Sequence, residues 1–301
     1  MATTPRFDLK AYLDQRRQAV NQELERRLVV LPPALARLRE AMAYTLLSGG
    51  KRLRPILCIA GAEVFGGQAA SVMPTACALE FIHAYSLIHD DLPAMDDDDL
   101  RRGRPTCHKV FGEAMAILAG DALLTEAFGL LAGQAQIHPP ALVMEVIAAV
   151  AAAAGARGMV GGQAADLMAE GGKDLSLDRV SFIHSLKTGA LIEVSLLTGA
   201  RLAGAEGADL EAMEKFGRKV GAAYQIADDL LGQEGRTELT GKPVGSDQAR
   251  GKATYPAVAG VETARREARR LIESGLSDLE RFSSRADHLR AIANYIINRE
   301  K

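Results

Sequence analysis

The chain has 301 residues, a formal net charge of −2 at pH 7 and a hydrophobic fraction of 48%. This composition allows one large domain or two ordinary ones. The near-neutral charge excludes a global field that would draw the protein to nucleic acid or an anionic membrane. We expect no signal peptide, because charged side chains occur within residues 6–10. The most apolar run, residues 146–156, is shorter than the roughly 20 residues that span a bilayer.

The cysteines and the secondary-structure signals indicate an intracellular, helical protein. Cys58, Cys77 and Cys107 have no metal-binding spacing and predict reduced thiols in the cytoplasm. No stretch shows the sustained alternation typical of a strand, so we expect no strand. No linker divides residues 1–301. We therefore predict a single-domain, all-α bundle of ten or more helices around one deep cavity.

The first predicted helices are followed by a cationic turn. An amphipathic helix over residues 7–28 and a helix over residues 34–47 are separated by two prolines. The segment Gly49-Gly-Lys-Arg-Leu-Arg-Pro55 then places three cations at a helix N-terminus, where the helix dipole disfavours them. An anion would cancel this cost, although a solvated turn is an alternative interpretation.

A buried helix that ends in an acidic loop dominates the next part of the chain. Residues 76–88 are apolar at almost every position, which predicts a helix buried on all sides, and Pro93 should end it near Asp91. Asp90 and Asp91 then lie at the negative end of the helix dipole, and residues 96–99 add four more carboxylates. A hard divalent cation would relieve the repulsion. A solvated acidic loop is the alternative.

The middle of the chain contains apolar helices with breaks. Asp121 falls on an apolar helix, where we expect it to be buried and to accept an orienting contact. Residues 141–154 form a small-residue helix that the glycines of 155–162 should end or bend. A further helix over residues 181–197 should be interrupted at Lys187-Thr-Gly189.

A second apolar helix meets a second pair of aspartates, at Asp228 and Asp229. Buried carboxylates are rare unless they are paired or bind metal. Two such helices facing each other would enclose a metal cluster with a strongly anionic ligand, for which a diphosphate fits best. Gln225, three residues before Asp228, shares its helix face. Two charged helices are expected over residues 261–301.

From about residue 44 onward, these motifs resemble the trans-isoprenyl diphosphate synthase family (polyprenyl synthetases), closest to the short-chain farnesyl diphosphate synthases of bacteria. The first aspartate-rich motif of that family matches Asp90-Asp-x-x-x-x-Asp96, and the second matches Asp228-Asp-x-x-Gly232. The family usually has a third Asp where Gly232 stands.

The resemblance implies a metal site and two diphosphate sites. It implies Mg²⁺, in three ions and replaceable by Mn²⁺, with these ligands: Asp90, Asp91, Asp96, Asp228 and Asp229. It further implies isopentenyl diphosphate at Lys51, Arg54, His83 and Arg102, and an allylic diphosphate at Arg101, Lys187, Lys242 and Lys252. Without the family match, His83 would be interpreted as an ordinary core residue and the lysines as solvated surface side chains.

The resemblance also implies the chemistry and the product. Thr188 and Gln225 would act with Lys187 at the developing allylic cation. Tyr85, with Ser86 beside it, would form the floor that limits the product to farnesyl diphosphate, although core packing also explains a buried Tyr. The family implies a cytoplasmic homodimer without membrane insertion. The alternatives are a geranylgeranyl diphosphate synthase, a non-catalytic regulatory subunit, a terpene cyclase and a purely structural helical protein.

Overall fold

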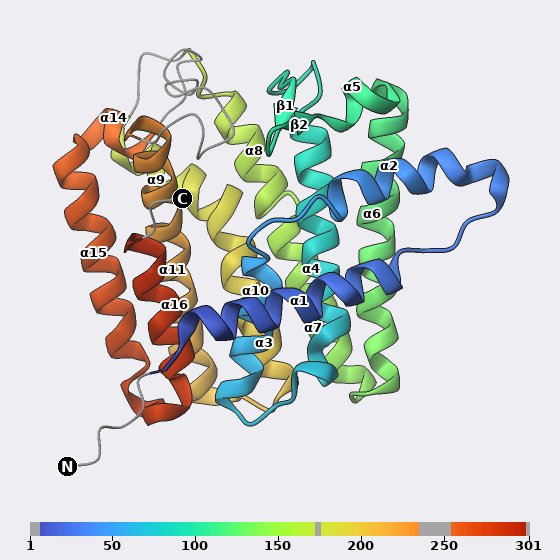
Figure 1. The fold of residues 1–301 in the computed structure, drawn as a ribbon. Helices are drawn as coiled ribbons and strands as arrows, with labels where there is room; N and C mark the ends of the chain where they lie inside the picture. The colour runs from blue at the N-terminus through green and yellow to red at the C-terminus, as the bar shows by residue number, and fades with distance from the viewer. Residues whose placement is uncertain (1–6, 172–175, 235–253, 299–301) are drawn as a thin grey trace.

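The protein is a bundle of roughly aligned helices, crossed on one side by the N-terminal helix (Figure 1). This computed structural model describes residues 7–171, 176–234 and 254–298. The helices of the core run up and down around α4, Ala69–Asp90, which packs against α3, Leu53–Val64, and α6, Glu113–Gly133. The predicted all-α architecture is confirmed.

Helix α4 is the buried helix that the sequence predicts. Its 22 residues include fourteen buried ones, from Val72 to Ile88. Asp91 caps it, and Leu92 N bonds to His89 O before Pro93 ends the helical geometry. The end of α4 therefore lies where the proline places it, with Asp90 as its last residue.

The acidic loop is closed by a short hairpin, so the expectation of no strand is wrong. Leu100 pairs with Pro105, and Arg101 with Arg104. The two-residue turn between them has positive φ at both positions, 54° at Arg102 and 72° at Gly103, as expected for a hairpin turn of type I′. Strands of two residues are too short to produce an alternating pattern.

The break after residue 154 and the interruption at Lys187 are both confirmed. Helix α7 ends at Ala154 and α8 begins at Met159. Helix α9 passes into a π-helical segment, Ser185–Gly189, before α10 begins at Ala190. A Cβ on Gly162 of α8 would lie 2.2 Å from Lys187 N. The absence of a side chain at Gly162 thus lets α8 approach the π segment closely.

Some apolar surface faces outward. Three stretches, Glu113–Gln136, Pro140–Leu167 and Leu177–Leu202, are long and apolar enough to cross a membrane by length and composition. The expectation that no stretch is long enough is wrong by that criterion, because it considered only an uninterrupted run. Asp121 is exposed on α6, so the prediction that it is buried is also wrong. All three cysteines are buried and free.

The remaining bounds complete the described fold. The other helices are α1 Leu9–Arg27, η1 Pro33–Leu35, α2 Ala36–Leu46, α5 Cys107–Phe111, η2 Gln134–Gln136, α7 Pro140–Ala154, α8 Met159–Leu167, α9 Leu177–His184, α10 Ala190–Leu202, α11 Gly207–Glu234, α14 Tyr255–Ala259, α15 Val261–Asp278, η4 Glu280–Ala286 and α16 Asp287–Asn298. The strands β1 and β2 are Leu100–Arg101 and Arg104–Pro105. The two charged C-terminal helices expected from the sequence are α15 and α16.

Candidate active site

The C-terminal ends of α4 and α11, which carry the two aspartate pairs, lie at the same end of the bundle as the hairpin β1–β2 (Figure 1). Asp90 ends α4, and Asp228 lies near the end of α11. Burial raises the pKa of Asp90 to about 6; the charge of Lys187 opposes this effect and that of Asp96 adds to it. A carboxylate so placed needs positive charge nearby in order to ionise fully.

The second aspartate of the first pair is held by an arginine. Arg101 Nε lies 2.9 Å from Asp91 Oδ1 and 2.8 Å from Oδ2, and Arg101 Nη2 lies 2.5 Å from Oδ1. The Asp91 side chain is only 2% exposed. This forked contact fixes the hairpin to the end of α4. It turns the predicted metal ligand Asp91 and the predicted diphosphate ligand Arg101 toward each other.

The second aspartate of the other pair is also engaged. Asp229 is buried, and its two oxygens accept hydrogen bonds from Gln225 Nε2 at 2.9 Å and from the backbone N of Tyr255 at 2.7 Å. His184 Nε2 lies 3.3 Å from Asp229 Oδ2. Asp229 therefore fastens α11 to α9 and α14. Asp228, by contrast, is exposed at the end of the bundle.

The π segment reaches both sides of the site. Thr188 Oγ1 donates to Gln225 Oε1 of α11 at 2.6 Å, and Lys187 is close enough to Asp90 of α4 to lower its pKa. Lys187 Nζ also lies 2.6 Å from Asp166 Oδ2 of α8. π segments of a single turn are frequent at functional sites because they redirect side chains. Here Thr188 contacts α11 directly, and the adjacent Lys187 acts on Asp90 of α4 through its charge.

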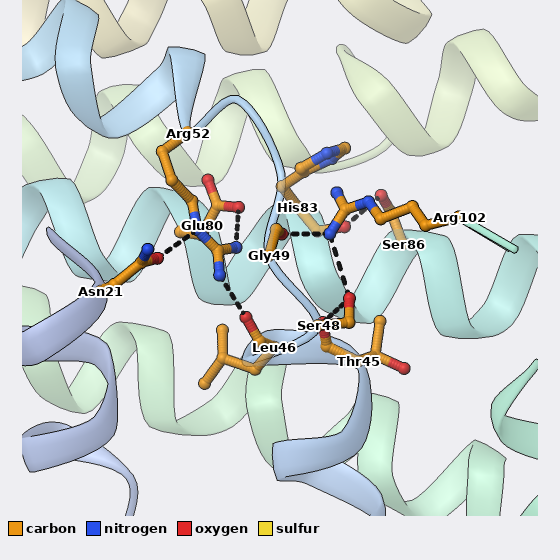
Figure 2. Close-up of polar contacts among 10 residues, drawn as sticks. All are labelled: Asn21, Thr45, Leu46, Ser48, Gly49, Arg52, Glu80, His83, Ser86 and Arg102. Carbon is orange, nitrogen blue, oxygen red and sulfur yellow. Dashed lines mark hydrogen bonds and ion pairs between the residues drawn. The ribbon is translucent and has the colours of Figure 1, made fainter. Parts of the chain in front are cut away.

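The cationic turn lies beside α4, as Figure 2 shows. Arg102 Nη1 donates to the backbone oxygen of Gly49 and, at 3.0 Å, to Ser48 Oγ. Lys51 is exposed, whereas Arg54 Nε is buried and has no hydrogen-bond partner among the described residues. A buried donor without a partner is costly, and a bound anion would satisfy it.

His83 lies on the face of α4 that this turn covers (Figure 2). Burial, together with the charges of Arg54 and Arg102, lowers its pKa well below the usual range. The imidazole is therefore neutral at pH 7. It can donate one hydrogen bond to an anion without adding a charge.

The two residues predicted to limit chain length lie one to two turns below the acidic loop. Tyr85 is 6% exposed, and its ring packs edge-on against His89 at 5.7 Å. Ser86 Oγ donates to the backbone oxygen of His83 at 2.9 Å. The ring of Tyr85, rather than the hydroxyl of Ser86, is the bulky group at this level of α4.

The remaining predicted site residues, and three that the sequence did not single out for the site, can now be placed. Lys242 and Lys252 lie outside the described residues. Gly232, where a third carboxylate was expected from the family pattern, is one helical turn beyond Asp228 in α11. Sequence reasoning counted Arg52 only among the three cations of the turn, and it gave no role to Glu80 or His184. The signal available for Glu80 was its position in an otherwise apolar run, because a buried carboxylate requires a cation.

An all-α bundle with two aspartate-rich helix ends facing a cationic turn is the architecture of a prenyl-transferring enzyme. The polyprenyl synthetase family model matches residues 35–295, and the chain belongs to this family and is a prenyltransferase. It is 49% identical over 253 residues to the farnesyl diphosphate synthase of Geobacillus stearothermophilus, covering 84% of each chain. It is 45% identical over 293 residues to the geranylgeranyl diphosphate synthase of Cyanophora paradoxa, covering 97% of each.

A solved structure gives the same fold. The geranyltransferase of Helicobacter pylori, complexed with magnesium and isoprenyl diphosphate, superposes with a TM-score of 0.85 at 30% identity. The match covers 99% of this chain and 98% of that one. The predicted family and fold are therefore confirmed, and the chain is a trans-prenyl diphosphate synthase.

Proposed function

We propose that the protein condenses isopentenyl diphosphate with dimethylallyl and then geranyl diphosphate to give farnesyl diphosphate. The observation that carries the proposal is the convergence of opposite charges at one end of the bundle. The π segment bonds to α11, the helix of Asp228, and its Lys187 lowers the pKa of Asp90 through its charge. The buried Arg54 Nε, whose guanidinium is close enough to Asp228 to be influenced by its charge, lacks a partner among the described residues. Two separate acidic and cationic groups suit two diphosphates, one held through metal and one held directly.

The donor set suits Mg²⁺. Asp90, Asp96 and Asp228 offer hard carboxylate oxygens at the same end of the bundle. Across residues 7–171, 176–234 and 254–298, no group of three or more His, Cys, Asp or Glu side chains is close enough to hold an ion alone. Mg²⁺ is commonly bound through one or two carboxylates and substrate phosphates, so oxygens of the allylic diphosphate would complete the coordination.

The metal, when bound, would neutralise charge that grows on the leaving diphosphate. Lys187 and Arg101 add positive charge on the same side, because both lower the pKa of Asp90. The allylic C–O bond breaks with its electron pair passing to diphosphate, and the double bond of isopentenyl diphosphate forms the new C–C bond. The resulting cation loses a proton to the released diphosphate.

The residues around the reacting carbons hold and shield them. Lys51, Arg54, His83 and Arg102 would bind isopentenyl diphosphate. The Thr188 hydroxyl, already ordered by Gln225, would present its oxygen to the developing cation. Apolar side chains of α4 exclude water, which would otherwise quench the cation. Because Asp228 is the exposed member of its pair, we expect activity without a carboxylate at Gly232.

The product assignment to fifteen carbons rests on the likeness to farnesyl diphosphate synthases, with Tyr85 as the proposed floor of the cavity. At 1.5 Å per residue, its Cα lies about 7.5 Å from that of Asp90 along the helix axis. A buried ring at that depth would block a longer chain. A geranylgeranyl product is the second candidate, supported by the likeness to the Cyanophora paradoxa enzyme over 97% of both chains.

The test is direct. The protein is incubated with Mg²⁺, isopentenyl diphosphate and either dimethylallyl or geranyl diphosphate, and the products are separated by mass. A fifteen-carbon product supports the proposal. A twenty-carbon product would support the geranylgeranyl assignment, and no prenyl transfer with either allylic substrate would refute both.

We also propose a homodimer built on the outward apolar faces of α6 and α7. Ile117, Leu118 and Met144 are 44%, 53% and 63% exposed, more than is usual for such side chains in a monomer's core helices. Covering them in a second copy would remove this apolar area from water. Light scattering behind gel filtration measures the mass; a monomer at micromolar concentration would contradict the proposal.

A further inference from the structure

A buried ion pair lies directly behind the cationic turn. Arg52 Nη1 bonds to Glu80 Oε1 of α4 at 2.6 Å, Nε to Asn21 Oδ1 of α1 at 2.8 Å, and Nη2 to the backbone oxygen of Leu46 at 2.8 Å. Figure 2 shows the guanidinium between these three partners. Arg52 and Glu80 are each only 3% exposed. One side chain thus joins α1, the end of α2 and α4.

The backbone of the same residue is in a conformation that it would not adopt unaided. Arg52 has φ 53°, in the left-handed region that favours glycine, and Gly49 and Gly50 before it have φ 87° and 123°. This conformation persists only if surrounding contacts impose it. The three hydrogen bonds of the Arg52 guanidinium supply that constraint. The turn between α2 and α3 is therefore specified by a side chain that points away from the site.

The neighbours of Arg52 in sequence are the proposed ligands of isopentenyl diphosphate. Lys51 precedes it, and Arg54 follows two residues later. Glu80 is three residues before His83 on α4 and hence shares its helix face. The buried Arg52–Glu80 pair consequently holds the turn, with Lys51 and Arg54, in a fixed position relative to the face of α4 that carries His83. The anion would bind between the two.

The pair also has an electrostatic consequence. Glu80 lies close enough to Arg54 and Arg102 to influence the pKa of both, although burial is the larger effect on each. Without Arg52, the Glu80 carboxylate would be left buried without its cation, and Arg54 or Arg102 would be the available substitute. If either arginine paired with Glu80 in place of Arg52, the anion site would lose one of its cations.

We propose that Arg52 and Glu80 are a positioning pair for isopentenyl diphosphate, holding the turn in its left-handed conformation and keeping Glu80 from capturing the ligand cations. This inference rests on the proposed assignment of that substrate to Lys51, Arg54 and His83. Neither Arg52 nor Glu80 needs to touch the substrate.

The test separates positioning from stability. Arg52→Met, Glu80→Met and the double variant are assayed with isopentenyl and geranyl diphosphates varied in turn, and their thermal unfolding is measured. Each single variant should raise the KM for isopentenyl diphosphate about 10- to 100-fold, because small misplacements of binding groups have effects of this size. The KM for geranyl diphosphate should change by less than about threefold, since only one of the two sites is disturbed.

The double variant is decisive. Apolar residues of similar volume often replace a buried ion pair without loss of stability, so its melting temperature should exceed that of either single variant. Its KM for isopentenyl diphosphate should nevertheless stay high, because the turn has lost its three hydrogen bonds. A double variant with wild-type KM, or an equal rise in both KM values, would overturn the proposal.

Two further variants guard the result. If the Met variants do not fold, Asn21→Ala removes one of the three bonds at a half-buried site and should raise the same KM about threefold; no rise would count against the pair. Glu63→Gln weakens the Arg16–Glu63 pair, which also joins α1 to α3, and should leave both KM values unchanged. Wild-type protein that fails to consume isopentenyl diphosphate would instead refute the proposed function.

Discussion

The Thr188 hydroxyl donates a 2.6 Å hydrogen bond to Gln225 Oε1, and Gln225 Nε2 in turn donates to Asp229 at 2.9 Å. This chain of contacts runs from the π segment to Asp229, the second residue of the second aspartate pair. It fixes the amide orientation of Gln225, because its oxygen faces a donor and its nitrogen faces a carboxylate. Because the Thr188 hydroxyl is the donor in this contact, the lone pairs of its oxygen remain able to accept or to face a positive charge.

Thr188→Val tests the value of that orientation. Valine has the same shape but no donor, so Gln225 Oε1 loses its partner and the hydroxyl oxygen is absent from the site. We expect kcat to fall roughly tenfold, with both KM values changed much less. Thr188→Ser, which keeps the hydroxyl, is the control and should retain most of the activity. Equal kcat in the wild type and the Val variant would show that the hydroxyl has no catalytic part.

Removal of either proposed metal ligand, Asp90 or Asp228, should strongly reduce metal-dependent transfer. Asp90→Ala and Asp228→Ala each delete a proposed Mg²⁺ ligand, and we expect kcat to fall by roughly 10²-fold or more. Glu211→Ala, which removes an exposed carboxylate near the start of α11, is the matched control. Chelation should stop the wild-type reaction, and added Mg²⁺ should restore it. Turnover that persists in excess chelator is incompatible with the metal mechanism.

Tyr85→Ala should lengthen the product. Removing the ring opens space along α4 below Asp90, so we expect products of twenty or more carbons at the expense of fifteen. Tyr85→Phe keeps the ring and should keep the wild-type distribution. Mass spectrometry of the product chains distinguishes the two. If the folded, active Ala variant gives the wild-type distribution, Tyr85 does not set the length.

Gly162→Ala should distort the π segment. Its Cβ would lie 2.2 Å from Lys187 N and 2.5 Å from Lys187 Cα, both backbone atoms that cannot move aside independently. We expect a loss of stability of about 1–3 kcal/mol and a matching loss of activity. Gly129→Ala on α6 meets no atom within 4 Å, and it should be neutral or stabilising by about 0.5–1 kcal/mol. Urea unfolding measures both; a fully stable Gly162→Ala would contradict the packing argument.

Stability should fall as the pH drops below about 6.5, in part through His288. Burial lowers the pKa of His288, whose Nε2–H donates to Ala60 O at 2.9 Å. The unfolded state therefore binds the proton more readily, and the free energy of unfolding decreases toward acid by up to about 1.4 kcal/mol per pH unit for one such group. His288→Gln should reduce this slope between pH 7.5 and 5.5. An unchanged slope would exclude His288 as a contributor.

Much of the site was predictable because its signals are local. Pro93 determines where α4 ends, and the Lys187-Thr-Gly triplet marks the interruption that became the π segment. Arg52 was not predictable, because its partners lie 31 and 28 residues away on two other helices. Asp121 was misjudged because an apolar composition does not reveal which face of a helix meets solvent. The hairpin was missed because two-residue strands carry no periodicity.

The three buried cysteines have a practical consequence for chemistry at the surface. Burial raises the pKa of Cys58 and Cys77 to about 12 and that of Cys107 to about 11, so at neutral pH only on the order of 10⁻⁴ or less of each thiol is the reactive thiolate. Alkylating reagents should leave the folded protein intact while modifying the unfolded chain. A single cysteine introduced on an exposed helix face would then be the preferred attachment point for a fluorophore or spin label, with no need to remove the native thiols.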